Sequence, residues 1–355
     1  MLAGAMVGKA IKSIIKRIVN PVLDGSGVYD GWLQALEGRA TWTILMYHRV
    51  VPDKALDPFD TGMCVTREHF AAQLAYLARI AEIVPLGETI AGLAAGTMTP
   101  RRRMVSITFD DGYRDNLTEA LPVLQRQRLP FTVFVTTGGL EANEPFWWDR
   151  IGAAIARTDR RELAVELPGQ GELRLPLGTL HRASAVQKLG DALWAHPDLG
   201  RGDLVAEIER RLGVDGRRLS PARLGPDEVV QLCQAGVEIG AHTVSHRNLS
   251  RLSAEEVASE MRTSRAYLER LCDRPVPGFA YPAGYSSPEV LRVARETGFS
   301  YAVGTRSDIN LHPPALFELA RIGMPDSSVA DFKRSWGTRA RRLGAVAAGS
   351  APIAP

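Results

Sequence analysis

The sequence predicts an α/β protein in which short buried strands alternate with helices around a mainly parallel sheet. Seven short runs rich in β-branched and aromatic residues recur along the chain, and most are continuously apolar, as strands buried on both faces are. Longer segments with helical periodicity separate them. The 355 residues exceed the roughly 150 expected of one domain, yet a single barrel can take up more than 200.

The predicted strands were identified by their composition and by the turn residues that flank them. In chain order they are Trp42–Tyr47, Met104–Phe109, Phe131–Val135, Val237–Ala241, Gly278–Tyr281, Phe299–Gly304 and Ala320–Met324. The predicted helices between them are Thr66–Ala81, Asn116–Arg128, Ser253–Leu271 and Ser286–Thr297. Thr66 and Ser253 are expected N-caps, and Glu256 completes a capping box with Ser253.

The β–α alternation breaks once, and the break predicts an insertion over about residues 146–224. Within it we expect a hairpin around Pro168 and Gly169, followed by helices over Ala183–Trp194 and Asp203–Leu212. The main domain should span residues 42–340. Residues 341–355 contain almost nothing that could be buried, so we predict a disordered tail.

Residues 1–41 predict an amphipathic helix followed by a linker. Apolar side chains fall on one helical face and basic ones on the other, namely Val7, Ile11, Ile14, Ile15 and Ile18 against Lys9, Lys12, Lys16 and Arg17. The lysines interrupt any secretory signal, so we expect a cytoplasmic protein. Two interpretations of the helix stay open: peripheral contact with the inner membrane, and packing on its own domain.

Composition narrows the class of protein. The chain is 45% hydrophobic and 23% charged, without a stretch of eighteen uncharged apolar residues, which argues against an integral membrane protein. Lys and Arg number 43 against 40 Asp and Glu, a balance that indicates no nucleic-acid partner. The three cysteines show no CxxC spacing, so we expect them to be unpaired, buried and suited to a reducing compartment.

Polar residues stand at the carboxyl ends of two predicted strands, where α/β barrels place their active sites. Asp110 and Asp111 follow one strand, and His242 and His246 follow another. Histidines at i and i+4 share a face in a helical turn and can bind one cation. With one aspartate they make a two-histidine, one-carboxylate set that leaves positions open for water and substrate.

Three motifs in order, ITFDDGY, GAHTVSH and FAYPAG, resemble those of the NodB-type polysaccharide deacetylases, carbohydrate esterase family 4. The resemblance spans about residues 42–335 without the insertion, and it implies a distorted (β/α) barrel of about seven strands. It implies that Asp111, His242 and His246 bind a divalent metal, zinc-like with cobalt or nickel as alternatives. Asp110 becomes the general base, and the main-chain N–H of Ala283, beside Tyr281 and Pro282, an oxyanion donor.

Two family positions differ in this chain. An Arg that orients the base in the family is here Ala280, and we expect Arg321 to replace it, because an Arg in a buried strand needs an acidic partner. The family's general-acid His on the last strand is missing. We expect His48 to serve as the general acid, because it follows the first strand, which neighbours the last in a closed barrel, as in the circularly permuted deacetylases of biofilm polysaccharides. His312 is the alternative.

The tryptophan pair Trp147 and Trp148 could stack on a sugar ring or anchor the insertion, and we expect one residue in each role. Together these features predict a hydrolase that removes an N-acetyl group from an N-acetylhexosamine-containing oligosaccharide, polysaccharide or lipid-linked glycan. The alternatives are a deformylase of a lipid-linked amino sugar, an inactive sugar-binding barrel and, less consistent with the strand pattern, an iron oxygenase. The glycan, the loaded metal, the role of the insertion and the oligomeric state stay open.

Overall fold

The computed structural model describes residues 41–56, 59, 62–98, 103–167, 169–194, 201–311, 314–334 and 336. The predicted N-terminal helix, the C-terminal tail and His312 therefore lie outside the described residues. Within this part of the chain, none of the helices combines the length and the apolar character needed to cross a membrane.

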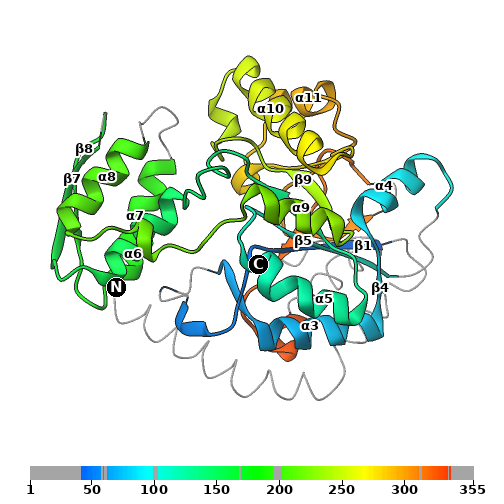
Figure 1. The fold of residues 1–355 in the computed structure, drawn as a ribbon, viewed down its shortest axis with the longest axis horizontal. Helices are drawn as coiled ribbons and strands as arrows, with labels where there is room; N and C mark the ends of the chain where they lie inside the picture. Colours follow the sequence, from blue (N-terminus) through cyan, green and yellow to red (C-terminus); the bar gives the residue numbers. More distant parts are fainter. Residues whose placement is uncertain are drawn as a thin grey trace, which may run out of the picture.

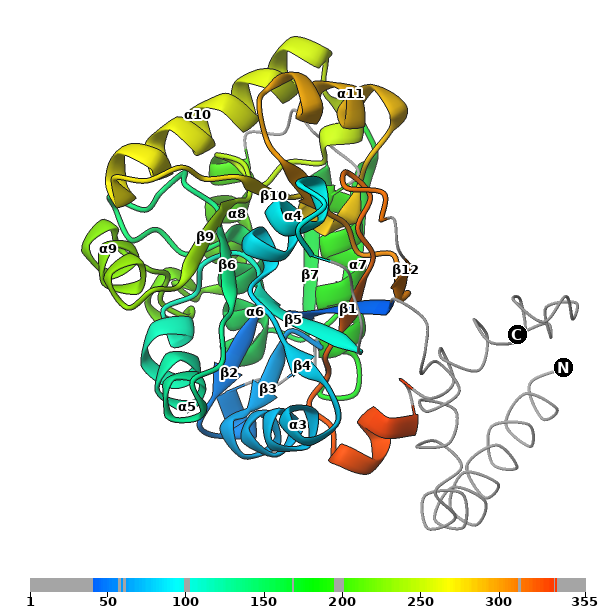
Figure 2. The same cartoon turned by 90° about the vertical axis from the view of Figure 1, so that its right-hand side faces the viewer.

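Parallel strands form the body of the protein, and helices surround them (Figure 2). Their order is β11-β10-β9-β6-β5-β1, with β13 on the other side of β1. They are β1 (Thr41–Tyr47), β5 (Met104–Phe109), β6 (Thr132–Val135), β9 (Glu238–Ala241), β10 (Gly278–Ala280), β11 (Tyr301–Val303) and β13 (Arg321–Gly323). All seven predicted strands are confirmed, and the continuously apolar runs are buried between the helices and the barrel interior.

The curled sheet closes between β11 and the segment that leads into β13. Val303 and Leu319 form a parallel bridge there, and the Gly304 N–H donates to the Leu319 carbonyl at 2.9 Å. Closure brings the last strand beside the first, as the barrel prediction requires. Short strands that the sequence did not reveal extend the structure, because two or three residues show no period: β2 (Arg49–Val51), β3 (Cys64–Thr66), β4 (Glu82–Ile83) and β12 (Asn310–Leu311).

The helices predicted after Thr66, Ser253 and Ser286 begin close to their predicted starts, whereas the sequence analysis did not predict α4 and α9. The Thr66 side chain accepts from the His69 N–H, and Ser253 and Glu256 form the predicted capping box. The predicted helix over residues 116–128 is instead a π-helical turn, η2 (Asn116–Ala120), followed by α5. The α-helices are α3 (Arg67–Ile80), α4 (Leu86–Ala94), α5 (Leu121–Gln127), α9 (Pro226–Gln234), α10 (Ala254–Cys272) and α11 (Pro288–Glu296).

The insertion forms a lobe beside the barrel (Figure 1). It contains α6 (Trp147–Arg157), the hairpin β7 (Glu162–Leu167) and β8 (Gly171–Pro176), α7 (Arg182–Trp194) and α8 (Arg201–Leu212). The pairing of β7 with β8 confirms the predicted hairpin. The lobe has its own apolar core, and the buried Arg150 side chain joins α6 to Glu209 of α8 with bonds of 2.6 and 3.0 Å.

The expectation of three unpaired cysteines is wrong. Cys233 at the end of α9 and Cys272 at the end of α10 form a disulfide, with their Cα atoms 6.0 Å apart. The sequence could not show this pair, because 39 residues separate the two cysteines and only helix packing brings them together. Cys64 is buried and takes no part in this disulfide, and the Arg49 guanidinium donates to its sulfur. The cysteines therefore no longer support the predicted cytoplasmic location, which stays a prediction.

Candidate active site

The carboxyl ends of β5 and β9 bring the predicted metal ligands together. Asp111 lies immediately beyond β5, and His242 and His246 lie in the turn after β9. Asp111 and His246 have positive φ angles of 74° and 51°, a conformation that side chains other than glycine rarely adopt. The His246 N–H donates to the Thr243 hydroxyl at 2.9 Å, which holds this turn. Such local strain is typical of residues whose direction is set by function.

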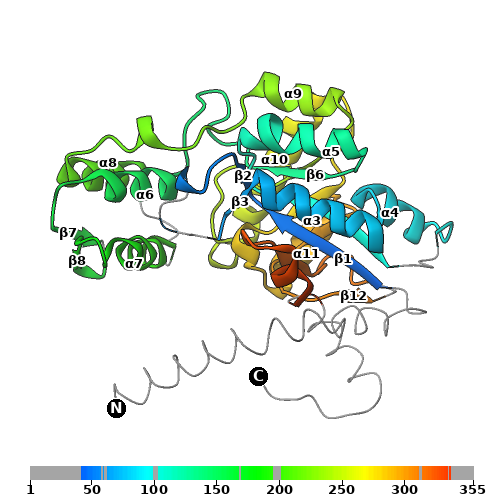
Figure 3. The same ribbon diagram turned by 90° about the horizontal axis from the view of Figure 1, so that it is seen from below.

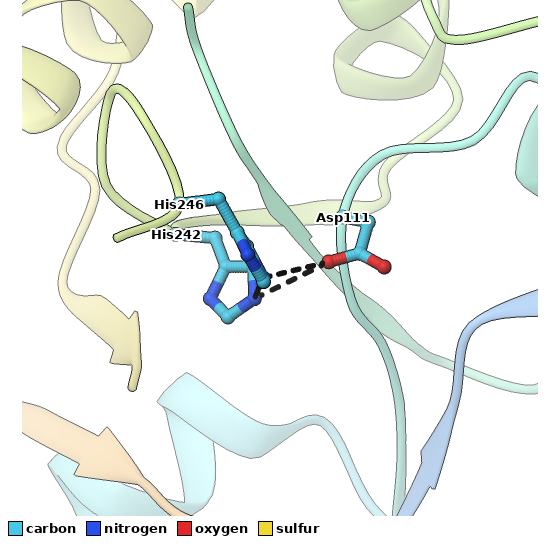
Figure 4. Close-up of side chains that lie close together, drawn as sticks. All are labelled: Asp111, His242 and His246. Atoms are coloured by element: carbon cyan, nitrogen blue, oxygen red, sulfur yellow. Dashed lines mark hydrogen bonds and ion pairs between the residues drawn. The ribbon is translucent and has the colours of Figure 1, made fainter. Parts of the chain in front are cut away.

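The three side chains point at one another (Figure 4). The Asp111 Oδ1 atom lies 3.4 Å from His242 Nε2 and 3.2 Å from His246 Nε2, and the two Nε2 atoms are 3.0 Å apart. All three residues are buried. Among the described residues, these three side chains form the group of histidine, cysteine and acidic residues that could hold one metal ion, because their ligand atoms all lie within 4.8 Å of one another.

The arrangement fits a divalent cation. His242 Nδ1 lies 2.8 Å from the Ala280 carbonyl oxygen, so Nδ1 carries the proton and Nε2 presents its lone pair to the cluster. Within the described part of the chain, the buried Asp111 Oδ1 accepts no hydrogen bond. A buried carboxylate oxygen and two imidazole nitrogens that face one another are costly unless a positive charge lies between them.

The electrostatics of the cluster favour the ligand form of Asp111. Burial by itself raises the pKa of this carboxyl, but the adjacent imidazoles of His242 and His246 outweigh burial and hold the pKa well below its usual value. Burial is the largest influence on His246 and lowers its pKa, which favours the neutral ring that a metal ligand needs. Burial also acts against the charged form of His242, yet the neighbouring carboxylates raise its pKa.

Asp110 stands beside the cluster and is held by Arg321. The Arg321 Nη1 and Nη2 atoms donate to the two Asp110 carboxylate oxygens at 2.7 and 2.6 Å. Arg321 also donates to the Gly304 carbonyl and to the Thr108 hydroxyl, and none of its surface is exposed. Burial raises the pKa of Asp110, but the Arg321 charge, followed by that of His242, brings it below the usual value. The structure therefore places Arg321 where the sequence predicted an orienting cation.

His48 follows β1 and lines the same pocket as the cluster. The η2 turn supports it, because the Asn116 side chain donates to the His48 carbonyl oxygen at 2.8 Å. A single π turn in this place is typical of functional sites. The structure thus brings His48 to the predicted edge of the barrel, near enough for its charge to act on Asp110 and Asp111.

Of the three residues from the third motif, Ala283 lines the pocket. It adopts a left-handed conformation with φ 50° and ψ 14°, which directs its main chain away from the β10 strand path. Tyr281, which the resemblance placed with the oxyanion and substrate residues, lies outside the pocket lining: its ring packs against Phe279 and its hydroxyl donates to the Phe317 carbonyl. Pro282 is buried and outside the pocket lining, so it shapes the turn.

The two tryptophans divide their roles. The Trp148 ring lies 4.8 Å from the His246 ring and lines the pocket, whereas Trp147 packs against the apolar core of the lobe. Trp194 at the end of α7, which the sequence did not single out, also lines the pocket, 5.4 Å from His246. The lobe therefore encloses one side of the histidine cluster with indole rings.

A hydrogen-bonded chain beneath these rings also escaped the sequence analysis. Trp148 Nε1 donates to the Tyr113 hydroxyl at 3.0 Å, and that hydroxyl donates to Asp149 at 2.8 Å. Asp149 lines the pocket, and burial raises its pKa to about 7. The Arg49 guanidinium lies over the Tyr113 ring. The sequence offered one sign of this chain, an acidic residue directly after two tryptophans. That pattern occurs without any regular spacing that would mark it as functional.

These residues surround a pocket of about 810 Å³ between the barrel rim and the lobe. This volume lies within the range of cavities that bind small molecules. A buried three-ligand set, a clamped spare carboxylate and a histidine meet at its floor. Such a constellation can bind a cation, accept a proton and donate another, which is the equipment of a metal-assisted hydrolase.

Comparisons with known proteins agree with this chemistry. The family model described as polysaccharide deacetylase matches residues 97–302, more than half of the chain. YxkH of Bacillus subtilis (strain 168), a protein named for polysaccharide deacetylase activity, is 21% identical over 310 residues. That alignment covers 86% of this chain and 80% of YxkH.

Two solved structures share the fold. The deacetylase PplD of Streptococcus pyogenes, solved with acetate, has a TM-score of 0.57 at 19% identity, covering 84% of this chain and 99% of PplD. IcaB of Ammonifex degensii has a TM-score of 0.53 at 18% identity, covering 85% of this chain and 97% of IcaB. With the family model matching over half of its length, this chain belongs to the polysaccharide deacetylase family.

Proposed function

We propose that the protein removes the acetyl group from an N-acetylhexosamine unit of a glycan, with a divalent metal and with Asp110 as the general base. Membership of the family makes the chain a deacetylase, a hydrolase of C–N bonds other than peptide bonds. The observation that carries the finer proposal is the spare carboxylate of Asp110, which Arg321 holds ionised beside a buried three-ligand cluster.

The donor set suits zinc. Two imidazole nitrogens and one carboxylate oxygen leave a coordination position for substrate, as catalytic zinc sites require, and cobalt or nickel accept the same donors. The bound cation would polarise the acetyl carbonyl and lower the pKa of the attacking water from 15.7 to about 7. Asp111, His242 and His246 would hold it.

The remaining residues supply positioning and proton transfer. Asp110 accepts the proton of the attacking water, and Arg321 keeps the carboxylate ionised and oriented for that task. The Ala283 N–H donates to the oxyanion of the tetrahedral state. His48 gives a proton to the departing nitrogen as the C–N bond breaks, so the products are acetate and a free amine.

Acetate release from N-acetylated chitooligosaccharides tests the proposal. We expect the wild-type protein loaded with zinc to release acetate, and Asp110→Asn to reduce kcat by about 10²- to 10⁴-fold, the usual contribution of a general base. Asp331→Asn, an exposed aspartate outside the pocket, is the matched control. Equal rates in Asp110→Asn and wild type would refute the assignment of Asp110 as the general base. Faster formate release from N-formylated substrates than acetate release from N-acetylated ones would identify the removed group as formyl.

A further inference from the structure

Helix α6 extends the pocket away from the reacting groups. The Trp148 ring lies 4.8 Å from His246, and the same helical face continues through Gly152 and Ala156 at i+4 and i+8. At 1.5 Å per residue, Ala156 lies about 12 Å farther along the helix axis. All three residues line the one pocket, which therefore reaches well beyond the catalytic rim.

The chemistry of the lining changes along this direction. Next to the cluster, Trp148, Trp194 and Asp149 offer ring faces and a carboxylate. Farther on, the lining is apolar. The segment after β2 reaches toward the lobe in Figure 3, and its residues line the same pocket as α6. We call the outer part the apolar arm; its lining is Ala55, Leu56 and Met63 from this segment and Gly152, Ala153, Ala156 and Val186 from the lobe.

Open space exists in the apolar arm. A Cβ atom added to Gly152 would meet no atom of the described residues within 4 Å, although Gly152 lies in the middle of α6. Leu56 is 54% exposed, an unusual state for a large apolar side chain that lines a cavity. The exposed Arg157 follows at the outer end of the arm, where the pocket meets solvent.

The apolar arm suits an aliphatic chain better than further sugar units. Sugar hydroxyls would lose their hydrogen bonds to water without gaining partners from these side chains. Each methylene that moves from water into such a site strengthens binding by about fourfold at full burial. The order of the lining, polar near the cluster and apolar beyond it, matches a molecule with a sugar head and an alkyl tail.

We propose that the substrate is an amphiphile, an N-acetyl amino sugar that carries an aliphatic chain at its anomeric end, and that this chain lies in the apolar arm. The inference rests on the proposed function, because it places the acetyl group at the cluster of Asp111, His242 and His246. The sugar ring then lies beside Trp148 and Asp149, between the reacting carbon and the arm.

The experiment compares β-glycosides of N-acetylglucosamine that carry methyl, hexyl and octyl chains, all below their micelle concentrations. We expect kcat/KM for acetate release to rise with chain length, by at least about tenfold from methyl to octyl after the cost of ordering the chain. The N-octanoyl derivative of the methyl glycoside carries the chain on the acyl side. Its kcat/KM, measured as octanoate release, should not exceed that of the N-acetyl methyl glycoside.

Two variants, one in each part of the arm's wall, test the location. Gly152→Leu fills the arm without a helix penalty, and Leu56→Glu places a charge in it at an exposed position. In both, the octyl-to-methyl ratio of kcat/KM should fall toward one. Gly190→Leu, another helical glycine with open space around it, and Leu180→Glu, at 94% exposure, are the matched controls and should keep the wild-type ratio.

The outcomes separate this inference from the proposed function. If acetate is released at rates independent of chain length, the inference is overturned while the function stands. If the N-octanoyl compound is preferred, the inference is overturned and the acyl group in the proposed function changes. A ratio that persists in both wall variants also overturns it. If no glycoside releases acetate but calorimetry shows tighter binding of octyl than of methyl glycoside, with that difference lost in Gly152→Leu, the inference stands and the function fails.

Discussion

Replacing Arg321 with Met tests whether the buried ion pair organises the site. The substitution removes two charge-assisted hydrogen bonds of 2.7 and 2.6 Å, and it leaves the Asp110 carboxylate without its main partner at 4% side-chain exposure. Removing one member of a buried pair costs about 3–5 kcal/mol. Since a whole domain is stabilised by about 5–15 kcal/mol, the free energy of unfolding should fall by a large fraction.

The same change should move the pKa of Asp110 upward. Burial favours the neutral acid, and Arg321 is the largest of the influences that oppose burial. The base must be ionised to accept a proton, so the acidic limb of the kcat/KM profile should shift to higher pH. In wild type, the low pKa of Asp110 contributes stability that is present above its unfolded pKa and is lost as pH falls through its folded pKa. In the variant the sign reverses, and the stability deficit should shrink as pH falls from 7 toward 4.

Urea unfolding and acetate release across pH measure both effects. The double variant Asp110→Asn with Arg321→Met removes both charges, so it should be more stable than the sum of the single losses predicts, by about 3 kcal/mol of coupling. Arg321→Lys keeps the charge without the bidentate fork and should fall between wild type and Met. The reasoning would be refuted if the losses in unfolding free energy of the two single variants simply added up in the double variant and if the acidic limb of the kcat/KM profile of Arg321→Met stayed where it is in wild type.

Three further perturbations follow from the geometry. A chelator should abolish acetate release and zinc should restore it, while His242→Ala should weaken calorimetric zinc binding by at least about 100-fold; unchanged zinc affinity would remove His242 from the ligand set. Trp147→Leu should lower the free energy of unfolding by about 2–4 kcal/mol with KM nearly constant, whereas Trp148→Leu should raise KM by about tenfold; the reverse pattern would contradict the division of roles. Cys233→Ser should cost up to about 4 kcal/mol in urea unfolding, because the disulfide closes a 39-residue loop, and should leave kcat near wild type; an equal unfolding midpoint would argue that the bond does not form in solution.

Local patterns in the sequence determined the strands and the candidate site residues at their ends. Each barrel strand is a short segment that is buried on both faces. Such segments can be recognised in the sequence because burial on both faces requires consecutive apolar residues. Asp110, Asp111, His242 and His246 could be singled out because they follow these runs directly. The carboxyl ends of parallel barrel strands share one rim, so residues that follow these ends are expected to lie close together.

Only the tertiary structure decided which distant side chains complete the site. Asp110 and Arg321 are 211 residues apart, and their bidentate contact depends on β13 lying beside β1. The same holds for the Cys233–Cys272 disulfide and for Trp194, which the lobe places over His246. These contacts leave no period or spacing in the chain, because they arise where separately folded elements pack against one another, and that geometry is a property of the whole core.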